Sequence, residues 1–225
     1  MPQAGLHGLV GMATRKWTSK REWLLWGAML GSFVPDMDNL GVAFATLTKM
    51  STEGIHRTAT HSVFFIVAII AVFYLIGQGK KDIRWNNLGL GIGLGMLLHI
   101  LLDLILWFNG VNLFWPLGGE INFWANYTPP EWFMKFMDPT EFLFFAFYLW
   151  TLGVWSRKAS TDGEFMKTHL VWLIVEVALF VIFTPLAYIM TKGYLTIFGA
   201  LYLFSLLMIF FVTIRMRKTI AAVAG

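Results

Sequence analysis

The stretch NLGLGIGLGMLLHILLDLILWF, residues 87–108, decides the class of fold, because it is long and apolar enough to cross a lipid bilayer as one helix. Two ionisable side chains interrupt it, His99 and Asp103. Their i and i+4 spacing puts both on one helix face, one turn apart. Ionisable groups inside an apolar span are costly unless they pair, bind an ion or line a wet cavity. The two residues are therefore either a buried ion pair or part of a metal site.

Apolar runs near the ~20 residues needed to cross a bilayer recur along the chain. They lie at about 23–45, 61–78, 141–156, 169–190 and 195–214, and a shorter apolar stretch occupies residues 2–14. With 57% hydrophobic and 13% charged residues, the composition excludes an ordinary soluble domain. The sequence predicts an all-α polytopic membrane protein with about six transmembrane helices plus a short N-terminal apolar helix. We find no repeat or linker that would divide residues 1–225, so we expect a single domain.

The basic residues indicate topology rather than a nucleic-acid partner. Four short segments between the apolar runs hold 13 of the 17 Lys and Arg residues. They are Arg15, Lys16, Lys20 and Arg21; Lys80, Lys81 and Arg84; Arg157, Lys158 and Lys167; and Arg215, Arg217 and Lys218. Cytoplasmic loops carry an excess of Lys and Arg. We therefore expect these segments and the C-terminus in the cytoplasm, and loops 46–60 and 109–140 on the outer side.

The apolar run 23–45 is interrupted by Pro35 and by two aspartates, Asp36 and Asp38. Irregular backbone at membrane depth is tolerated only where protein buries it or water reaches it. We expect a helix over residues 23–34 that breaks at Pro35, followed by an extended turn on which both carboxylates converge on one cation. The alternative is a solvated acidic turn.

The motif HRTATHS, residues 56–62, supplies further ligand candidates. Its histidines are five residues apart and miss a common helical face. We expect His56 on a loop and His61 at the start of the next helix, with Thr60 or Ser62 as its N-cap. Arg57 is a candidate clamp for a phosphate oxyanion, because its guanidinium is planar and always charged. The alternative is an arginine that snorkels to the lipid headgroups.

The outer segment 109–140 carries aromatic residues and prolines, which predict an irregular lid at headgroup level rather than a long helix. The motif DPTE, residues 138–141, stands where this segment enters the fourth span. Asp138 is a candidate metal ligand there, and Glu141 is a candidate ligand or general base. As an N-terminal capping cluster, the same residues need no function. Four alternate glycines from Gly89 to Gly95 predict a close helix–helix contact.

The ionisable residues of the first 145 positions lie at compatible depths, so we expect one pocket that opens outward. The candidate metal ligands are His7, Asp36, Asp38, His56, His61, His99, Asp103 and Asp138. Because the chain has no cysteine, a metal must be held by His, Asp, Glu and water. Zinc suits an imidazole-rich set best and manganese comes next. We expect two or more divalent ions, because the candidate ligands outnumber those that one ion takes.

These motifs together resemble a known family. His7 with Gly11, Pro35-Asp36-x-Asp38, the motif of residues 56–62, His99-x-x-x-Asp103, Trp115-Pro116 and Asp138-Pro139 are similar in order and spacing to the LexA-regulated, YdjM-like inner-membrane proteins. The resemblance covers roughly residues 1–145, and residues 146–225 add further transmembrane helices. It implies a multi-pass protein of the inner (plasma) membrane with metal-dependent hydrolase activity. More loosely, the order of ligands is similar to that of zinc-dependent phospholipase C and P1 nuclease.

The function that we expect is metal-dependent hydrolysis of a phosphoester in a lipid or another substrate at headgroup level, with Arg57 and Glu141 as catalytic candidates. The partners expected are membrane lipids, including a phospholipid or lipid-phosphate substrate, and not nucleic acid. A metal-ion or proton transporter is one alternative. A non-catalytic membrane protein with a structural metal is another, but its site would be coordinatively closed.

Overall fold

The computed structural model describes residues 3–18 and 20–224 and is all-helical in these residues, apart from a single β-bridge between Val111 and Ile121. The N-terminal helices are α1 (Ala4–Ala13), α2 (Arg15–Thr18), α3 (Leu24–Gly31) and α4 (Asn39–Leu47). The long helices are α5 (Val63–Lys80), α6 (Ile83–Leu106), α7 (Glu131–Ala159), α8 (Met166–Ile189) and α9 (Tyr194–Arg215), followed by α10 (Arg217–Ala224). The described part of the chain also contains three short 3-10 helices: η1 (Pro35–Asp38), η2 (Ala59–His61) and η3 (Gly163–Phe165).

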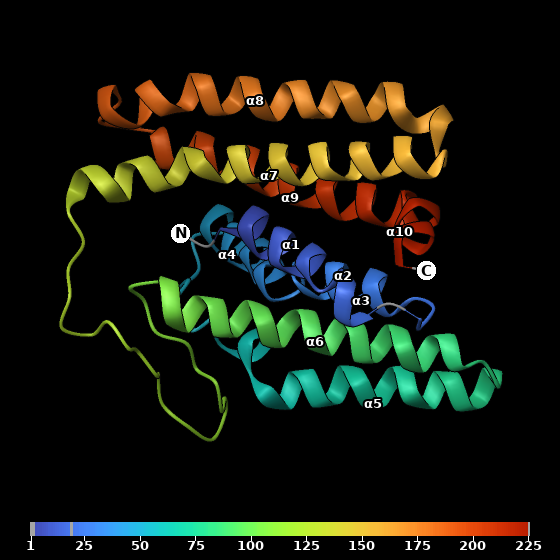
Figure 1. Cartoon of the computed structure of the whole chain (residues 1–225). Helices are drawn as coiled ribbons and strands as arrows, with labels where there is room; N and C mark the ends of the chain where they lie inside the picture. The colour runs from blue at the N-terminus through green and yellow to red at the C-terminus, as the bar shows by residue number, and fades with distance from the viewer. Residues whose placement is uncertain (1–2, 19, 225) are drawn as a thin grey trace.

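The long helices lie side by side, with α8 against α7 at one edge and α5 against α6 at the other (Figure 1). The short helices α1 and α3 fill the space between α7 and α6. Among the described residues, four helical segments are long and apolar enough to cross a membrane: α5, α6, Gly163–Ile189 and α9. The expected count of about six is not confirmed. The N-terminal apolar stretch forms the short helix α1, as expected, while its first residues, Met1 and Pro2, lie outside the described residues.

The first predicted span is broken close to the expected position. Helix α3 ends at Gly31, before Val34, and Pro35 opens the 3-10 helix η1, which leads into α4. The expected extended turn at residues 35–38 is wrong, because a proline at the first position of a helical turn has a preset φ that favours another turn. Asp36 and Asp38 therefore diverge instead of meeting at one cation.

The alternate glycines of α6 pack against two helices at once, which confirms the predicted close contact. A Cβ on Gly91 or Gly95 would clash with the backbone of α3, and a Cβ on Gly89 or Gly93 would clash with side chains of α5. On α3, Gly31 meets the backbone of α6 in the same way. Small residues let helix backbones approach closely. This approach holds the C-terminal end of α3 against the turn of α6 that follows Gly95.

The segment before α7 is irregular only over residues 107–130, where it crosses the end of the helix layer (Figure 1). Helix α7 begins at Glu131 and includes Pro139, so the expectation of an irregular segment as far as residue 140 is wrong, and residues 138–141 do not cap the N-terminus of α7. The lost hydrogen bond at Pro139 does not end the helix, because α7 packs on α1 and α8 along its length. The irregular segment also contacts the start of α5, because the N–H of Val63 donates to the carbonyl of Leu113 over 2.9 Å.

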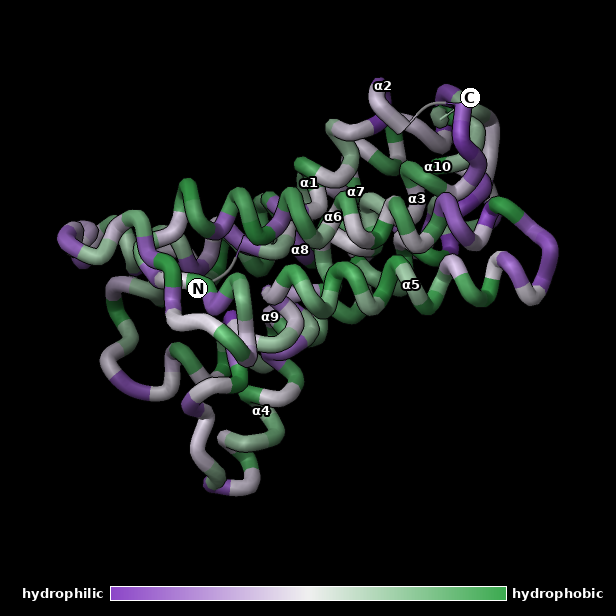
Figure 2. Tube along the Cα trace, turned by 90° about the horizontal axis from the view of Figure 1, so that it is seen from below, coloured by the Kyte–Doolittle hydropathy of each residue, from purple (hydrophilic) through white to green (hydrophobic). Residues whose placement is uncertain are grey.

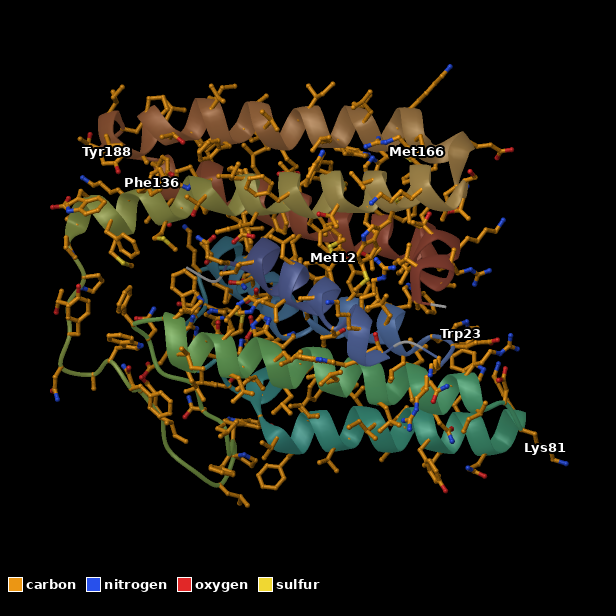
Figure 3. The ribbon with its side chains drawn as sticks, in the orientation of Figure 1. Met12, Trp23, Lys81, Phe136, Met166 and Tyr188 are labelled. Carbon is orange, nitrogen blue, oxygen red and sulfur yellow. The ribbon has the colours of Figure 1, made fainter. Side chains whose placement is uncertain are left out.

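The four basic segments meet at one end of the molecule. Figure 3 shows Lys81, Trp23 and Met166 at this end, and Phe136 and Tyr188 at the opposite end. Here Arg15 Nε donates to the carbonyl of Val223 over 2.7 Å. A common end is what the positive-inside interpretation requires. The side of the membrane on which this end lies stays a prediction.

Candidate metal centre

Five buried side chains converge where α1, η1, η2 and α6 meet. Within 4.8 Å of one another, ligand atoms of His7, His99 and Asp103 form one group, and those of Asp36, His61 and His99 form a second. Each of the five residues is at most 1% exposed. The i and i+4 pair predicted from residues 87–108 thus becomes the centre of the cluster, with His99 shared by both groups.

Most polar atoms of this cluster lack a hydrogen-bond partner among the described residues. These atoms are His7 Nδ1 and Nε2, both carboxylate oxygens of Asp36 and of Asp103, His61 Nε2 and His99 Nε2. Buried polar groups are normally paired, and buried charges are paired or coordinate metals. The residues therefore fit a divalent ion, which would satisfy these atoms together.

The distances between ligand atoms in the cluster suit the binding of these atoms to a common metal ion. His7 Nε2 lies 3.1 Å from Asp103 Oδ1, and His61 Nε2 lies 3.5 Å from Asp103 Oδ2. His99 Nε2 lies 3.7 Å from Asp103 Oδ2 and 3.8 Å from the Asp36 carboxylate. Two ligand atoms bonded to one tetrahedral zinc at ~2.0 Å are about 3.3 Å apart. The observed distances lie close to this value.

The hydrogen bonds of His99 and His61 leave Nε2 of each ring for a cation. His99 Nδ1 is 2.8 Å from the carbonyl oxygen of Ser32, so this nitrogen donates and Nε2 carries the lone pair. His61 Nδ1 faces Asp38 Oδ2 at 3.3 Å. Metal-binding histidines generally donate their other N–H to a carbonyl or carboxylate in this way. Sequence reasoning missed Ser32, since a backbone carbonyl leaves no mark in the residue pattern.

Asp38 lies outside the cluster of candidate ligands, contrary to the expectation that it binds the ion beside Asp36. One of its oxygens accepts from His56 Nδ1 over 2.7 Å. The other accepts from the N–H of Arg57 and from the hydroxyl of Thr60, each over 3.0 Å. With these donors and His61 Nδ1 around it, the carboxylate orients the motif of residues 56–62. His56 is likewise directed at Asp38 rather than at the cluster.

The pKa values of Asp38 and His61 follow from these contacts. Burial by itself would raise the pKa of Asp38, but hydrogen bonds from His56 and His61 outweigh burial and hold the pKa of this carboxyl well below its usual range. For His61, burial lowers the pKa, but the carboxylates of Asp103 and Asp38 beside the ring reverse the effect and raise the pKa above its usual value. Both residues lie outside the four candidate spans. Asp38 is therefore a fixed negative charge behind His61.

Arg57 lies beside the cluster and does not extend toward the headgroups. Its Nη1 donates to the carbonyl oxygen of Asn109 over 2.8 Å, and its Nη2 lies 3.6 Å from Asp103 Oδ2. The backbone has a left-handed φ of 60° at this position, and the side chain is buried. The carbonyl of Asn109 is a second backbone partner that sequence reasoning missed. Because its Nε has no partner among the described residues, the guanidinium keeps a donor for a further acceptor.

The structure places Glu141 and Asp138 outside both groups of ligand atoms. The N–H of Gly5 donates to Glu141 Oε1 over 2.7 Å, so this carboxylate caps the N-terminus of α1, the helix that carries His7. Asp138 lines a separate pocket with Lys135 and Tyr194, between α7 and the start of α9. Their expected roles as ligands therefore have no geometric support.

The partly exposed residue nearest to the cluster belongs to the motif of residues 56–62. The side chain of His56 is 26% exposed, whereas the five cluster side chains are buried. The irregular segment closes over this side, because the N–H of Asn112 donates to the carbonyl of Arg57 over 3.0 Å. His169, the fifth histidine, lies on α8 beside Gly153 and away from the cluster.

Comparisons with known proteins give the family. Searches of curated proteins and of solved structures find no match, so the looser similarity to zinc-dependent phospholipase C and P1 nuclease stays a prediction. The family model described as YdjM inner membrane protein matches residues 4–219. The match includes the helices after residue 145, which the motifs alone did not reach. Together with its apolar helices, this match shows that the chain belongs to the YdjM inner membrane protein family and is a multi-pass inner-membrane protein.

Proposed function

We propose that this protein is a membrane-embedded, metal-dependent hydrolase. The observation that carries the proposal is the convergence of unpaired donor atoms from His7, Asp36, His61, His99 and Asp103 in a buried cluster. A divalent ion held there would supply Lewis acidity to a water molecule and to the attacked group.

Zinc is the ion we propose first, because three imidazoles take part, and manganese is second. One imidazole nitrogen binds one ion, so the two groups that share His99 Nε2 cannot both use it. Asp103 faces His7 with one oxygen and His61 with the other. Asp103 would thus offer one oxygen beside each of two histidines, which supports the expectation of more than one ion per chain.

The substrate class that we propose is a phosphoester in a lipid or another headgroup-level molecule. Arg57 carries a buried guanidinium next to Asp103, and planar guanidinium groups bind phosphate oxygens through paired hydrogen bonds. The partly exposed His56 lies under an irregular segment that is rich in aromatic residues. Such residues favour the headgroup region of a membrane.

A transporter is the second candidate, and Glu176 is the observation that favours it. This residue of α8 is fully buried, and neither of its carboxylate oxygens has a hydrogen-bond partner among the described residues. An ionisable residue inside a membrane span indicates an ion or proton path by default. Transport predicts that the protein carries divalent ions or protons across a vesicle membrane.

Metal content and phosphate release test the proposal together. We expect purified wild-type protein to hold zinc or manganese, and His99→Ala to lose most of it, since loss of one ligand weakens a multi-ligand site severely. His169→Ala is the matched control, because this buried histidine lies outside the cluster. The metal-loaded protein is then offered phospholipids and lipid pyrophosphates. If neither phosphate nor a phosphorylated headgroup were released and divalent ions entered the vesicles, the transporter would replace the hydrolase.

A further inference from the structure

Helix α4 leaves the body of the protein beside the metal centre. Figure 2 shows that it projects sideways from the layer of long helices. The residues that face outward on α4 are Leu40, Phe44 and Leu47, spaced i, i+4 and i+7, which puts them on one helix face. Phe44 is 62% exposed and Leu47 is 84% exposed. This apolar face is uncovered within the described chain.

Lipid is the occupant that the surroundings of α4 indicate. Helix α4 follows η1 and helix α5 follows η2, and the two 3-10 helices contact each other at the metal centre. The outer surface of α5 carries exposed Phe64 and Val67 and belongs to a membrane span of a multi-pass inner-membrane protein. Through the contact of η1 with η2, α4 is therefore close to a span whose outer surface faces lipid in a multi-pass protein. Apolar groups in that position gain by contact with acyl chains.

The polar end of α4 lies beside the cluster. Asp38, the residue before α4, accepts the hydrogen bond of His56, which is the partly exposed histidine of the site. Arg57 follows directly, with its guanidinium beside Asp103. One edge of the molecule thus carries an apolar helix face that ends beside a buried cluster of candidate metal ligands and the guanidinium of Arg57. This order of groups matches an amphiphile with an acyl chain and an anionic head.

We propose that α4 lies in the lipid at the edge of the metal centre and guides an amphiphilic substrate to it. The acyl chain contacts the face of Leu40, Phe44 and Leu47, while the phosphate reaches Arg57. The guiding role rests on the proposed hydrolase, whereas the lipid contact of α4 does not.

Site-directed fluorescence tests the lipid contact without any activity, and the chain offers no native cysteine that would interfere. A Phe44→Cys variant carries an environment-sensitive dye in phospholipid vesicles. Val181→Cys, on the exposed face of span α8, is the lipid control, and Lys81→Cys, in the polar turn after α5, is the water control. We expect nitroxide-labelled lipid to quench the dye at residue 44 as it does at residue 181. If aqueous iodide quenches the dye at residue 44 as strongly as it quenches the dye at residue 81, the proposal is overturned.

Chain-length dependence tests the guiding role. The variant Phe44→Ser/Leu47→Ser is compared with Val177→Ser/Val181→Ser, which removes exposed apolar side chains from α8. We expect kcat/KM for a long-chain lipid phosphate to fall about tenfold only in the α4 variant, with a short, water-soluble phosphoester unaffected. Equal losses on both substrates contradict guidance. If the wild-type protein hydrolyses neither substrate, both the hydrolase proposal and the guiding role are refuted. The quenching experiment then still decides whether α4 contacts lipid.

Discussion

At the scale of single residues, the two carboxylates that follow Pro35 have opposite roles. Asp36 is buried with both oxygens unpaired among the described residues, whereas Asp38 is surrounded by donors from the motif of residues 56–62. A ligand needs a free lone pair that points at the ion, and an orienting group needs its lone pairs filled by the ligands it holds. Hydrogen bonding therefore separates two residues that the sequence pattern treats alike.

Asp38→Asn should weaken metal binding without abolishing it. The amide keeps the shape but loses the charge that orients His61, and loss of such a partner typically costs about 10- to 100-fold in metal affinity. Asp138→Asn is the matched control, because this acid lies outside both groups of ligand atoms. Titration with a competing chelator measures the affinities. A loss for Asp138→Asn as large as that for Asp38→Asn would show that Asp138 is a ligand after all.

Arg57→Lys should impair turnover of a phosphoester and leave the metal content near that of wild type. Lysine keeps the positive charge but lacks the planar pair of donors, and removal of one contact to a transition-state oxyanion costs about a hundredfold in rate. Steady-state kinetics and elemental analysis on the same preparation separate the two effects. If metal were lost together with activity, Arg57 would be holding the ligand Asp103 in place rather than contacting substrate.

At the scale of elements, the packing of α3 on α6 sets the position of His99. Gly95 lies one turn before His99 and touches the backbone of α3, and the carbonyl of Ser32, just after α3, accepts from His99 Nδ1. Any increase in the distance between the two helices would therefore move the acceptor away from the imidazole. The glycines thus help to position the candidate metal ligand His99, although they offer no ligand atom themselves.

Gly95→Ala should destabilise the protein and weaken its metal site, because the added Cβ would overlap the backbone of Ala28 and Ser32. Overpacking of this kind costs about 1–3 kcal/mol. Gly199→Ala in α9 makes the same change where no atom lies within 4 Å, and alanine there should add about 0.5–1 kcal/mol of helix stability. Thermal unfolding in detergent, with and without added metal, compares the two variants. If Gly95→Ala left the thermal stability unchanged, this result would contradict the close contact of α3 and α6.

At the scale of the whole molecule, the arrangement of charge predicts the orientation in the membrane. The basic segments share the end marked by Lys81 and Met166 in Figure 3, and the metal centre lies toward the opposite end, where α5 begins and α6 ends. If the basic end is cytoplasmic, the site opens on the outer side of the inner membrane.

Cysteine labelling checks this orientation. In intact cells, an impermeant thiol reagent should label Asn122→Cys, in the irregular segment, and should leave Lys81→Cys unmodified until the membrane is opened. The unmodified chain serves as the blank, since it has no cysteine. Labelling of Lys81→Cys alone would invert the molecule and move the metal centre to the cytoplasmic side.

The sequence by itself determined the membrane class and the pairing of His99 with Asp103. It also determined the long helices after residue 60 to within a few residues, except for the early start of α7. These features depend on local length, hydropathy and helical spacing, which the chain carries without reference to its fold. Only the tertiary structure decided that Asp36 faces the cluster, that Asp38 stands behind His61, and that Glu141 caps α1. Each of these roles depends on partners that lie far away in the chain, such as Gly5 for Glu141. The helical turn at Pro35 and the contact of α3 with α6 bring these partners together, and no residue spacing encodes them.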